Sequence, residues 1–125
     1  MGFYQREWRG QAAYAAGCDA EEQVARWYER SGFQVLARRW RGSAGEIDLV
    51  VSDGIDVVFV EVKRSKTRQA AVQRVTRRQM DRIFGAASEF LGLMPKGQLT
   101  PCRFDVGLVF GAGDIDVIEN AFGGA

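Results

Sequence analysis

The sequence predicts an α/β domain in which a central mixed sheet is flanked by helices. The expected elements run along the chain in the order helix, strand, strand, strand, helix, strand, strand. Two β-branched apolar runs, at residues 47–51 and 57–63, are typical of strands. A length of 125 residues with 46% hydrophobic content suffices for one core, so we expect a single domain over residues 19–122.

The N-terminal elements follow from periodicity and capping. Residues 1–18 contain three glycines and little hydrophobic periodicity, so we expect a flexible arm with at most a short helical piece. Asp19 is a plausible N-cap for a helix over residues 20–30, whose apolar side chains recur at helical spacing. Residues 33–38 alternate between two faces and predict the first strand, which a glycine-containing break at residues 42–45 ends.

The middle of the chain predicts a hairpin followed by a long helix. The Ser-Asp-Gly turn at residues 52–54 joins the two apolar runs as an antiparallel hairpin. A helix from about Ala70 to Gly92 then places most of its apolar side chains on one face, with arginines toward the other. The last expected elements are strands at residues 102–110 and 114–118 and a glycine-rich tail that includes residues 123–125.

The composition excludes several kinds of site. The chain has no histidine, which excludes serine and cysteine triads, histidine general bases and histidine metal sites. Cys18 and Cys102 lie far apart and lack the short spacing of a zinc or redox site. No run approaches the roughly 18 apolar residues that span a bilayer, and the N-terminus lacks the apolar core of a secretory signal. We therefore expect a soluble cytoplasmic protein without a membrane partner.

The net charge of +1 conceals an uneven distribution. Residues 46–60 carry four acidic and no basic side chains, whereas residues 61–82 carry eight basic and two acidic ones. Fourteen of the 17 basic residues are arginine, whose planar fork binds phosphate at two points. This composition indicates a polyanion partner, although a GC-rich genome also enriches arginine.

Charged side chains interrupt both strands of the predicted hairpin. Asp48 lies inside the first apolar run, and Glu61 and Lys63 lie inside the second. Glu61 and Lys63 share a strand face, and Asp48 projects into the same corner if the two strands pair. Burial of carboxylates in apolar strands is costly unless a cation or a full set of hydrogen bonds compensates. We therefore interpret the three residues as a candidate chemical centre.

Two converging carboxylates are the oxygen ligands that Mg²⁺ or Mn²⁺ prefers. Asp48 and Glu61, with the backbone carbonyl of Val62, would hold such an ion, which would keep water in its remaining positions. A metal so held lowers the pKa of bound water and polarises a phosphodiester. Lys63 would orient or deprotonate the attacking water, or stabilise the pentavalent phosphate.

Each of these residues also has an ordinary structural interpretation. A Glu-x-Lys pair on a strand is commonly a solvated ion pair across the strand face, and a single aspartate before a strand is commonly a turn residue. The combination of Asp48 with Glu61 and Lys63 across one hairpin favours the site.

Residues 45–50 (Gly-Glu-Ile-Asp-Leu-Val) and 59–63 (Phe-Val-Glu-Val-Lys) together resemble the D-x(n)-E-x-K signature of the restriction-endonuclease-like superfamily, which includes archaeal Holliday-junction resolvases. More closely, the chain resembles the YraN-like family of small bacterial proteins from about residue 22 to residue 122. Residues 22–25 (Glu-Gln-Val-Ala) and 102–106 (Cys-Arg-Phe-Asp-Val) also carry this resemblance. It implies a restriction-endonuclease-like three-layer domain with a central five-stranded mixed sheet.

The resemblance also implies roles for further residues. Glu22 is implied as an additional catalytic acid that reaches the metal directly or through water, or else as a helix N-terminal acid favoured by the macrodipole. Arg41 would contact backbone phosphate or form a surface ion pair. Glu46 is expected to face away from Asp48, and Asp105 is expected to be a structural partner of its neighbours. The sequence departs from the family at Arg39, where an asparagine is expected, and around residues 78–79, where a lysine is displaced.

The function implied is a metal-dependent endonuclease that hydrolyses phosphodiester bonds of structured or branched DNA and acts as a homodimer. The alternative is a non-catalytic nucleic-acid-binding or protein-interaction module of the same fold. A third interpretation is a metal-dependent hydrolase of small phosphate esters, but the sequence lacks the glycine-rich phosphate cradle expected of such an enzyme. Because basic residues follow Lys63 directly, they would lead a bound phosphate backbone to the metal, unless they form only a solvated helix face. With Arg41, these candidate DNA contacts are Arg64, Lys66, Arg68, Arg74, Arg77, Arg78 and Arg82.

Overall fold

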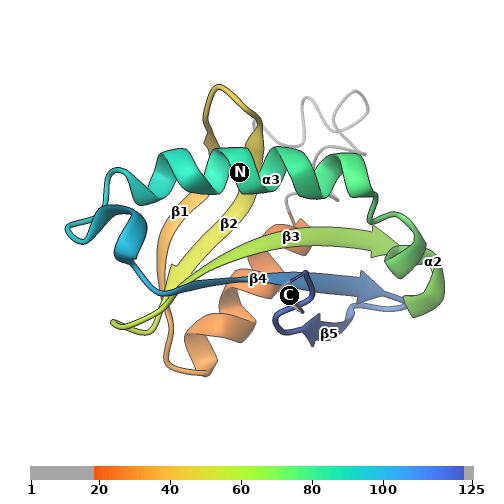
Figure 1. Cartoon of the computed structure of the whole chain (residues 1–125). Coiled ribbons are helices and arrows are strands. Elements are labelled where there is room, and N and C mark those ends of the chain that lie inside the picture. Colours follow the sequence, from red (N-terminus) through yellow and green to blue (C-terminus); the bar gives the residue numbers. More distant parts are fainter. Residues whose placement is uncertain (1–18, 123–125) are drawn as a thin grey trace, which may run out of the picture.

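The computed structural model describes residues 19–122, which form an α/β domain on one five-stranded sheet (Figure 1). The strands lie in the order of the sequence, with β3 and β4 parallel and the other neighbours antiparallel. The predicted α/β class and mixed sheet are therefore confirmed, while the predicted arm at residues 1–18 and tail at residues 123–125 lie outside the described residues. The strands are β1 (Gln34–Arg41), β2 (Glu46–Ser52), β3 (Val57–Ser65), β4 (Cys102–Phe110) and β5 (Asp114–Ile118).

Helices cover both faces of the sheet and make it the middle of three layers (Figure 1). The first helix, residues 19–30, buries Val24 and Tyr28 in a cluster with apolar residues of β2 and β3. On the opposite face, α3 (Arg77–Leu91) buries Phe90 against Phe59 and neighbouring side chains. Within residues 19–122, every helix is too short or too polar to cross a membrane.

The prediction of one helix from Ala70 to Gly92 is wrong. The segment forms α2 (Arg68–Gln73) and α3, separated by three residues. Thr76 takes an extended backbone and accepts a hydrogen bond from the N–H of Gln79, whose side chain accepts from the N–H of Thr76. This reciprocal capping box starts a new helix, and its Thr-x-x-Gln pattern was a signal in the sequence. The basic face is therefore divided between two short helices and the turn between them.

The loop between β1 and β2 is held tightly against α3. The carboxylate of Glu89 accepts hydrogen bonds from the N–H and hydroxyl of Ser43, at 3.1 and 2.8 Å, and from the N–H of Ala44, at 3.1 Å. Gly85 lets the loop approach, since a Cβ atom added there would lie 2.6 Å from the Cβ of Ala44. The loop leads directly into β2, so this contact sets where β2 begins.

A buried carboxylate ties the first helix to β4. Asp105 of β4 is fully buried and accepts from the hydroxyl of Tyr28 at 2.6 Å. It also accepts from Arg103, at 3.0 and 3.2 Å, and from the N–H of Asn120 at 2.9 Å. These bonds satisfy the charge that burial would otherwise penalise. The contacts are those of the structural partner expected at this position.

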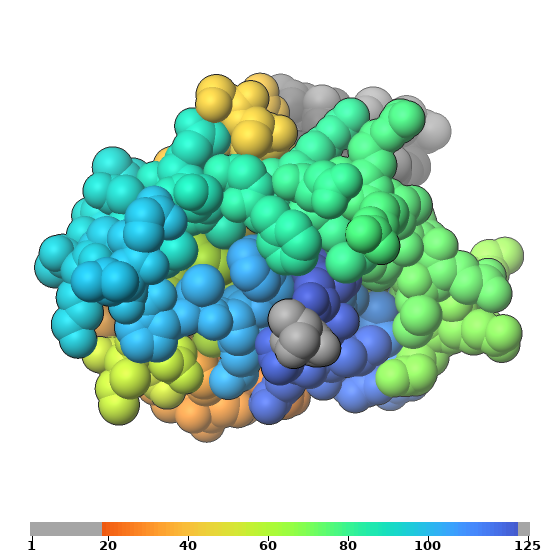
Figure 2. Space-filling view, viewed as in Figure 1, coloured from red at the N-terminus to blue at the C-terminus, as the bar shows by residue number. Residues whose placement is uncertain are grey.

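The C-terminal segment completes the face that α3 leaves open. Figure 2 shows β4 and β5, in blue, reaching the surface beside α3. After β5 the chain turns back, and the N–H of Ala121 donates to the carbonyl of Phe104 at 2.7 Å. Phe122 then packs near Phe84 and Phe104, with ring centroids 6.1 and 6.5 Å away. An aromatic group from three segments therefore fills the space between α3 and β4.

Gly85→Ala tests the contact between α3 and the β1–β2 loop. Alanine favours a helix over glycine by about 1 kcal/mol, but its methyl would clash with the stiff Cβ of Ala44, and overpacking costs about 1–3 kcal/mol. We expect the clash to prevail and lower the free energy of unfolding by about 1 kcal/mol in urea denaturation. A variant more stable than the parent would show that the β1–β2 loop moves to admit the methyl group without lowering the free energy of unfolding.

Candidate active site

The site lies where β2 and β3 separate. Their ladder pairs Leu49 with Val60 and does not continue to Asp48. Instead, the Asp48 carboxylate accepts the N–H of Val62 at 2.8 Å. The Asp48 side chain thus takes the place of a backbone carbonyl as the acceptor for the Val62 N–H, where the ladder between β2 and β3 would otherwise continue. This arrangement confirms the antiparallel hairpin and keeps the two strands apart at Asp48.

The three residues predicted as the chemical centre converge at this opening. Lys63 Nζ lies 2.9 Å from Oε2 of Glu61, and their side chains are only 12% and 10% exposed. The carboxyl groups of Asp48 and Glu61 lie close enough for the charge of Glu61 to raise the pKa of Asp48. Two carboxylates and an amine from neighbouring strands therefore share one small, largely buried space.

Burial disfavours the charged form of Asp48. Desolvation, followed by repulsion from Glu61, raises the pKa of Asp48 well above its ordinary value, despite the bond from Val62 and the charge of Lys63. Asp48 therefore retains its proton more readily than an exposed aspartic acid would. A bound cation would relieve the same repulsion, so the donor set fits a hard divalent metal.

The first helix contributes Glu21 to the site, whereas the predicted residue was Glu22. Glu22 is 41% exposed and pairs with Arg26 at 3.6 Å and Arg38 at 3.2 Å. Burial, followed by repulsion from Asp48, raises the pKa of Glu21 to about 7. Adjacent helical residues point about 100° apart, so the two cannot serve interchangeably.

The helix itself carried a signal for Glu21. Val24, Ala25 and Tyr28 follow Glu21 by three, four and seven residues, so they lie on the same helix face as Glu21. All three are apolar residues of the core. Glu22 belongs to a more polar stripe. Weighing the two acids against this apolar face would have favoured Glu21.

Glu46 and two arginines line the β1 side of the site. Glu46 lies close to Glu21, since its charge also raises the pKa of Glu21, whereas its orientation away from Asp48 stays a prediction. Its Oε2 lies 3.9 Å from both Arg39 Nε and Arg41 Nη2, which hold it toward β1. Arg39 Nη1 also lies 3.5 Å from Oε1 of Glu21 and lowers its pKa. Arg41 is 79% exposed, so it is available to solutes near the site.

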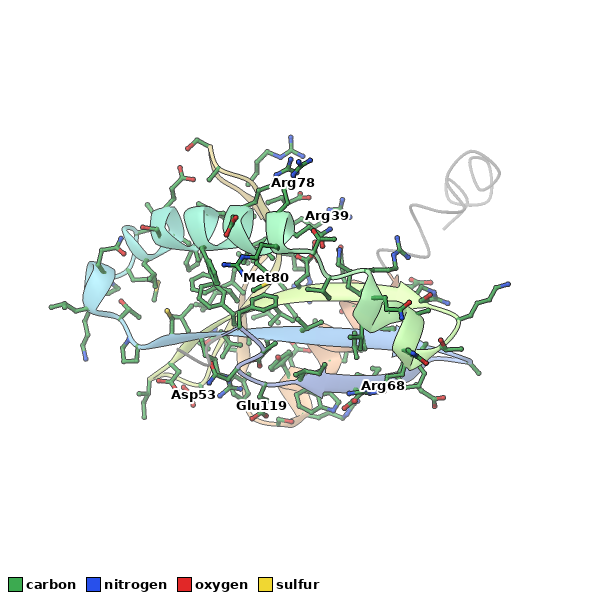
Figure 3. All side chains as sticks on the ribbon, turned by 45° about the vertical axis from the view of Figure 1, so that its right-hand side comes forward. Arg39, Asp53, Arg68, Arg78, Met80 and Glu119 are labelled. Carbon is green, nitrogen blue, oxygen red and sulfur yellow. The ribbon has the colours of Figure 1, made fainter. Side chains whose placement is uncertain are left out.

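The predicted DNA-contacting residues do not form one uniform surface. Arg68 lies beside β5 (Figure 3) and pairs with Asp116 at 2.6 Å. Arg74 donates a hydrogen bond to the carbonyl of Arg64 at 2.7 Å. These two side chains therefore hold α2 in place. Arg78 lies on the outer side of α3 (Figure 3). The exposed basic residues of this region include Arg64, Lys66, Arg77, Arg78 and Arg82.

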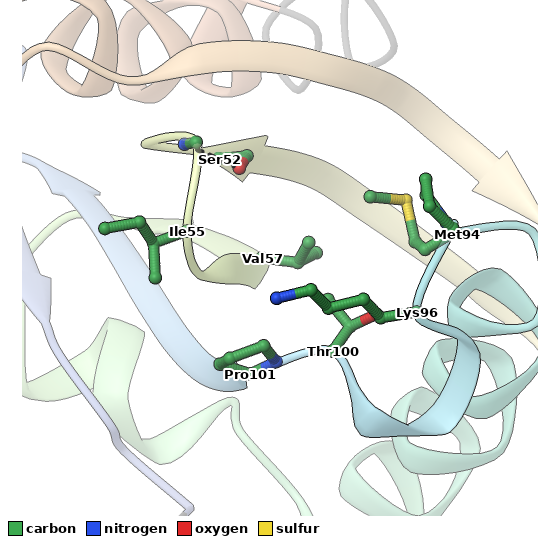
Figure 4. Close-up of a pocket in the computed structure, with 9 residues that line it drawn as sticks. Ser52, Ile55, Val57, Met94, Lys96, Thr100 and Pro101 are labelled. Carbon is green, nitrogen blue, oxygen red and sulfur yellow. Dashed lines mark hydrogen bonds between the residues drawn. The ribbon is translucent and has the colours of Figure 1, made fainter.

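A pocket of about 260 Å³ lies elsewhere, at the start of β3 (Figure 4). Val57 lines it, together with residues of the β2–β3 turn and of the segment after α3. Lys96 is the one charged side chain among its lining residues, and the pocket has no carboxylate. This pocket is therefore separate from the carboxyl groups of the candidate site.

The described residues contain no group of three or more acidic or cysteine side chains that could hold a metal by themselves. A metal at this site would thus rely on Asp48, Glu61, a backbone carbonyl and water. The role of the Val62 carbonyl in such a set stays a prediction.

Comparison with known proteins places these residues in a family. The model of the Uncharacterised protein family UPF0102 matches residues 20–109. The chain belongs to the UPF0102 family. The resemblance to the YraN-like family is confirmed by this match. Glu21, Asp48, Glu61, Lys63 and Asp105 all lie inside the matched range, so the whole candidate site belongs to the family domain.

Individual UPF0102 proteins align along nearly the whole chain. A UPF0102 protein of Cereibacter sphaeroides is 60% identical over 113 residues, covering 90% of this chain and 97% of its own length. A UPF0102 protein of Ruegeria pomeroyi is 52% identical over 115 residues, covering 92% and 94%. One of Dinoroseobacter shibae is 43% identical, covering 92% and 86%. The UPF0102 domain thus accounts for most of this chain.

Asp48→Asn tests the charge repulsion in the site. The folded pKa of Asp48 and of Glu21 lies above the unfolded value, so the stability that these two groups contribute is lost as pH rises from their ordinary values of 3.8 and 4.5 to about 7. Asparagine imitates the protonated acid, and we expect it to raise the free energy of unfolding at pH 8 by about 1–3 kcal/mol, and by less at pH 5.

Thermal unfolding of both proteins in EDTA across this pH range measures the difference. Asp53→Asn, in the exposed β2–β3 turn, is the matched control and should not reproduce the gain at pH 8. An Asp48→Asn variant that is less stable than the parent at every pH would contradict the repulsion.

Proposed function

We propose that the protein is a metal-dependent endonuclease that hydrolyses phosphodiester bonds of structured or branched DNA. The observation that carries the proposal is the convergence of the Asp48 and Glu61 carboxyl groups at the opening of the sheet, with Lys63 paired to Glu61. A largely buried carboxyl group with a raised pKa beside a lysine, such as Asp48 here, is typical of catalytic sites. The three-layer arrangement and the mixed five-stranded sheet support a restriction-endonuclease-like fold, since they match what that resemblance implied.

Asp48 and Glu61 would hold Mg²⁺ or Mn²⁺ with the Val62 carbonyl, and the bound ion would supply Lewis acidity and a more acidic water. In the hydrolysis, water oxygen bonds to phosphorus, the bond to the leaving oxygen breaks, and that oxygen departs with the electron pair and takes up a proton. Lys63, largely buried beside Glu61, would orient the water or donate to the phosphate oxygens. Glu21 would add negative charge from the first helix and hold water near the metal.

The surroundings of the site support a nucleic-acid substrate. Arg41 and the exposed basic residues of α3 offer cations for a phosphate backbone on the side of the β1–β2 loop. Arg82 lies against this loop, since its Cβ is 3.1 Å from the position of a Cβ added at Gly45. Shape or branching would then guide recognition more than base sequence, and a homodimer would let two strands be cut.

One observation favours a second candidate, a non-catalytic nucleic-acid-binding or protein-interaction module. Lys63 and the N–H of Val62 already satisfy the carboxylates of Glu61 and Asp48 without a metal. Such a site holds its shape without performing chemistry. Loss of Glu61 or Lys63 would then leave DNA binding intact.

The decisive experiment incubates the purified protein with labelled four-way junction, flap, single-stranded and duplex DNA, in Mg²⁺, Mn²⁺ or EDTA. We expect metal-dependent cleavage that falls at least about 100-fold in Asp48→Asn, Glu61→Gln and Lys63→Met, because each removes a group that acts in the transition state. Asp53→Asn is the control and should cleave normally. Binding without cleavage under every metal condition would support the non-catalytic module instead.

The divided basic surface gives a separate prediction for binding. Joint replacement of Arg77 and Arg78 by alanine should weaken DNA binding about tenfold and lower the slope of its salt dependence by about one to two, since both lie exposed on α3. Arg68→Ala should have a smaller effect, because its guanidinium is held by Asp116. Fluorescence anisotropy over a salt series in EDTA measures both. Equal losses of DNA affinity in the double variant and in Arg68→Ala would contradict the proposed division of the basic surface.

A further inference from the structure

Arg39 has an unusual backbone for its residue type. Its φ is +50°, and among residues 19–122 the one other non-glycine residue with positive φ is Asn120. The left-handed region costs an ordinary L-residue about 1–2 kcal/mol, while glycine adopts it freely and asparagine tolerates it. Residues kept in such conformations are concentrated at functional sites, where surrounding contacts hold them.

The backbone at Arg39 reverses the direction of the side chains around it. Residues two apart on a regular strand share a face. Here Arg38 pairs with Glu22 of the first helix, whereas Trp40 packs on Phe90 of α3, on the opposite face. The intervening Arg39 is thereby turned out of the regular strand.

The neighbouring strand reverses at the same level. Arg38 is opposite Leu49 and Trp40 is opposite Ile47, so Arg39 lies level with Asp48. Leu49 packs with the first helix and Ile47 packs with α3. Both irregularities therefore meet at the point where the proposed active site opens.

The Arg39 guanidinium lies among the carboxylates of this site. It is 3.5 Å from Glu21 and 3.9 Å from Glu46, and its side chain is 38% exposed. Both distances exceed the roughly 2.7–2.9 Å of a short charge-assisted hydrogen bond, so electrostatic attraction dominates these two contacts. Lys63 is the corresponding cation on the Glu61 side. One basic group thus flanks each side of the acidic cluster.

We propose that Arg39 is a further catalytic residue, whose guanidinium donates hydrogen bonds to the non-bridging oxygens of the scissile phosphodiester. This role rests on the proposed nuclease function. The planar fork matches two phosphate oxygens, and a phosphate at the rim would replace the two long contacts with shorter ones. The guanidinium stays protonated throughout. It stabilises charge that develops on phosphorus oxygens as water adds and the leaving oxygen departs with its electron pair.

The left-handed backbone provides a test that separates function from stability. Arg39→Gly removes the guanidinium and also relieves the backbone, so we expect an unchanged or higher melting temperature together with a single-turnover cleavage rate about 100-fold lower. Arg39→Lys keeps the charge without the fork and should remain about tenfold impaired. Added guanidinium ion at millimolar concentration should partly restore cleavage by the glycine variant, an effect that a structural role would not produce.

Arg38→Ala is the matched control, because the neighbouring arginine pairs with Glu22 away from the site and its loss should leave cleavage unchanged. Arg39→Asn, which tolerates the same backbone, replaces the glycine variant if that variant unfolds. If Arg39→Gly or Arg39→Asn cleaves DNA at the wild-type rate, the catalytic role of Arg39 is overturned while the nuclease function stands. Arg39 would then be only a counter-ion of the carboxylates. A wild-type protein that cleaves no DNA with any metal would overturn the nuclease function and this role together.

Discussion

The hydrogen bond from the Val62 N–H to the Asp48 carboxylate is the contact on which the site depends. A buried backbone donor must find an acceptor, and at this level of the sheet the acceptor is a side chain. The bond lets β2 and β3 separate without leaving Val62 unsatisfied. The same separation makes room for Glu61 and Lys63, which would otherwise lie on a continuous sheet face. A local substitution for one ladder bond therefore creates the acidic opening.

Contacts on both faces of the sheet hold this opening in place. On one face, the bond from Tyr28 to the buried Asp105 anchors the first helix, which presents Glu21 two turns earlier. On the other face, Glu89 of α3 fixes the loop that leads into β2. The site itself is electrostatically unfavourable, since its carboxylates repel one another, whereas these supporting contacts are fully satisfied. Stability elsewhere in the fold thus maintains a group of carboxyl side chains that repel one another.

Much of the fold and of the centre could be predicted because the signals are local. The β-branched run of β3 and the turn after β2 specify a hairpin, and strand alternation places Glu61 and Lys63 on one face. The break between α2 and α3 was also encoded locally, by the capping box that begins at Thr76, but the apolar periodicity on both sides obscured it. The single long helix was predicted because the apolar periodicity was given more weight than the capping box in the same segment.

The sequence by itself determined the α/β class, through the order of its helical and strand patterns. Charged residues inside two apolar strands determined that Asp48, Glu61 and Lys63 form one group. Only the tertiary structure decided that Glu21, and not Glu22, faces that centre, and that Arg68 is held by Asp116. It alone showed the left-handed Arg39 level with Asp48. The reason is physical: periodicity depends on neighbours in the chain, whereas ion pairs and backbone reversals depend on which distant segments pack together.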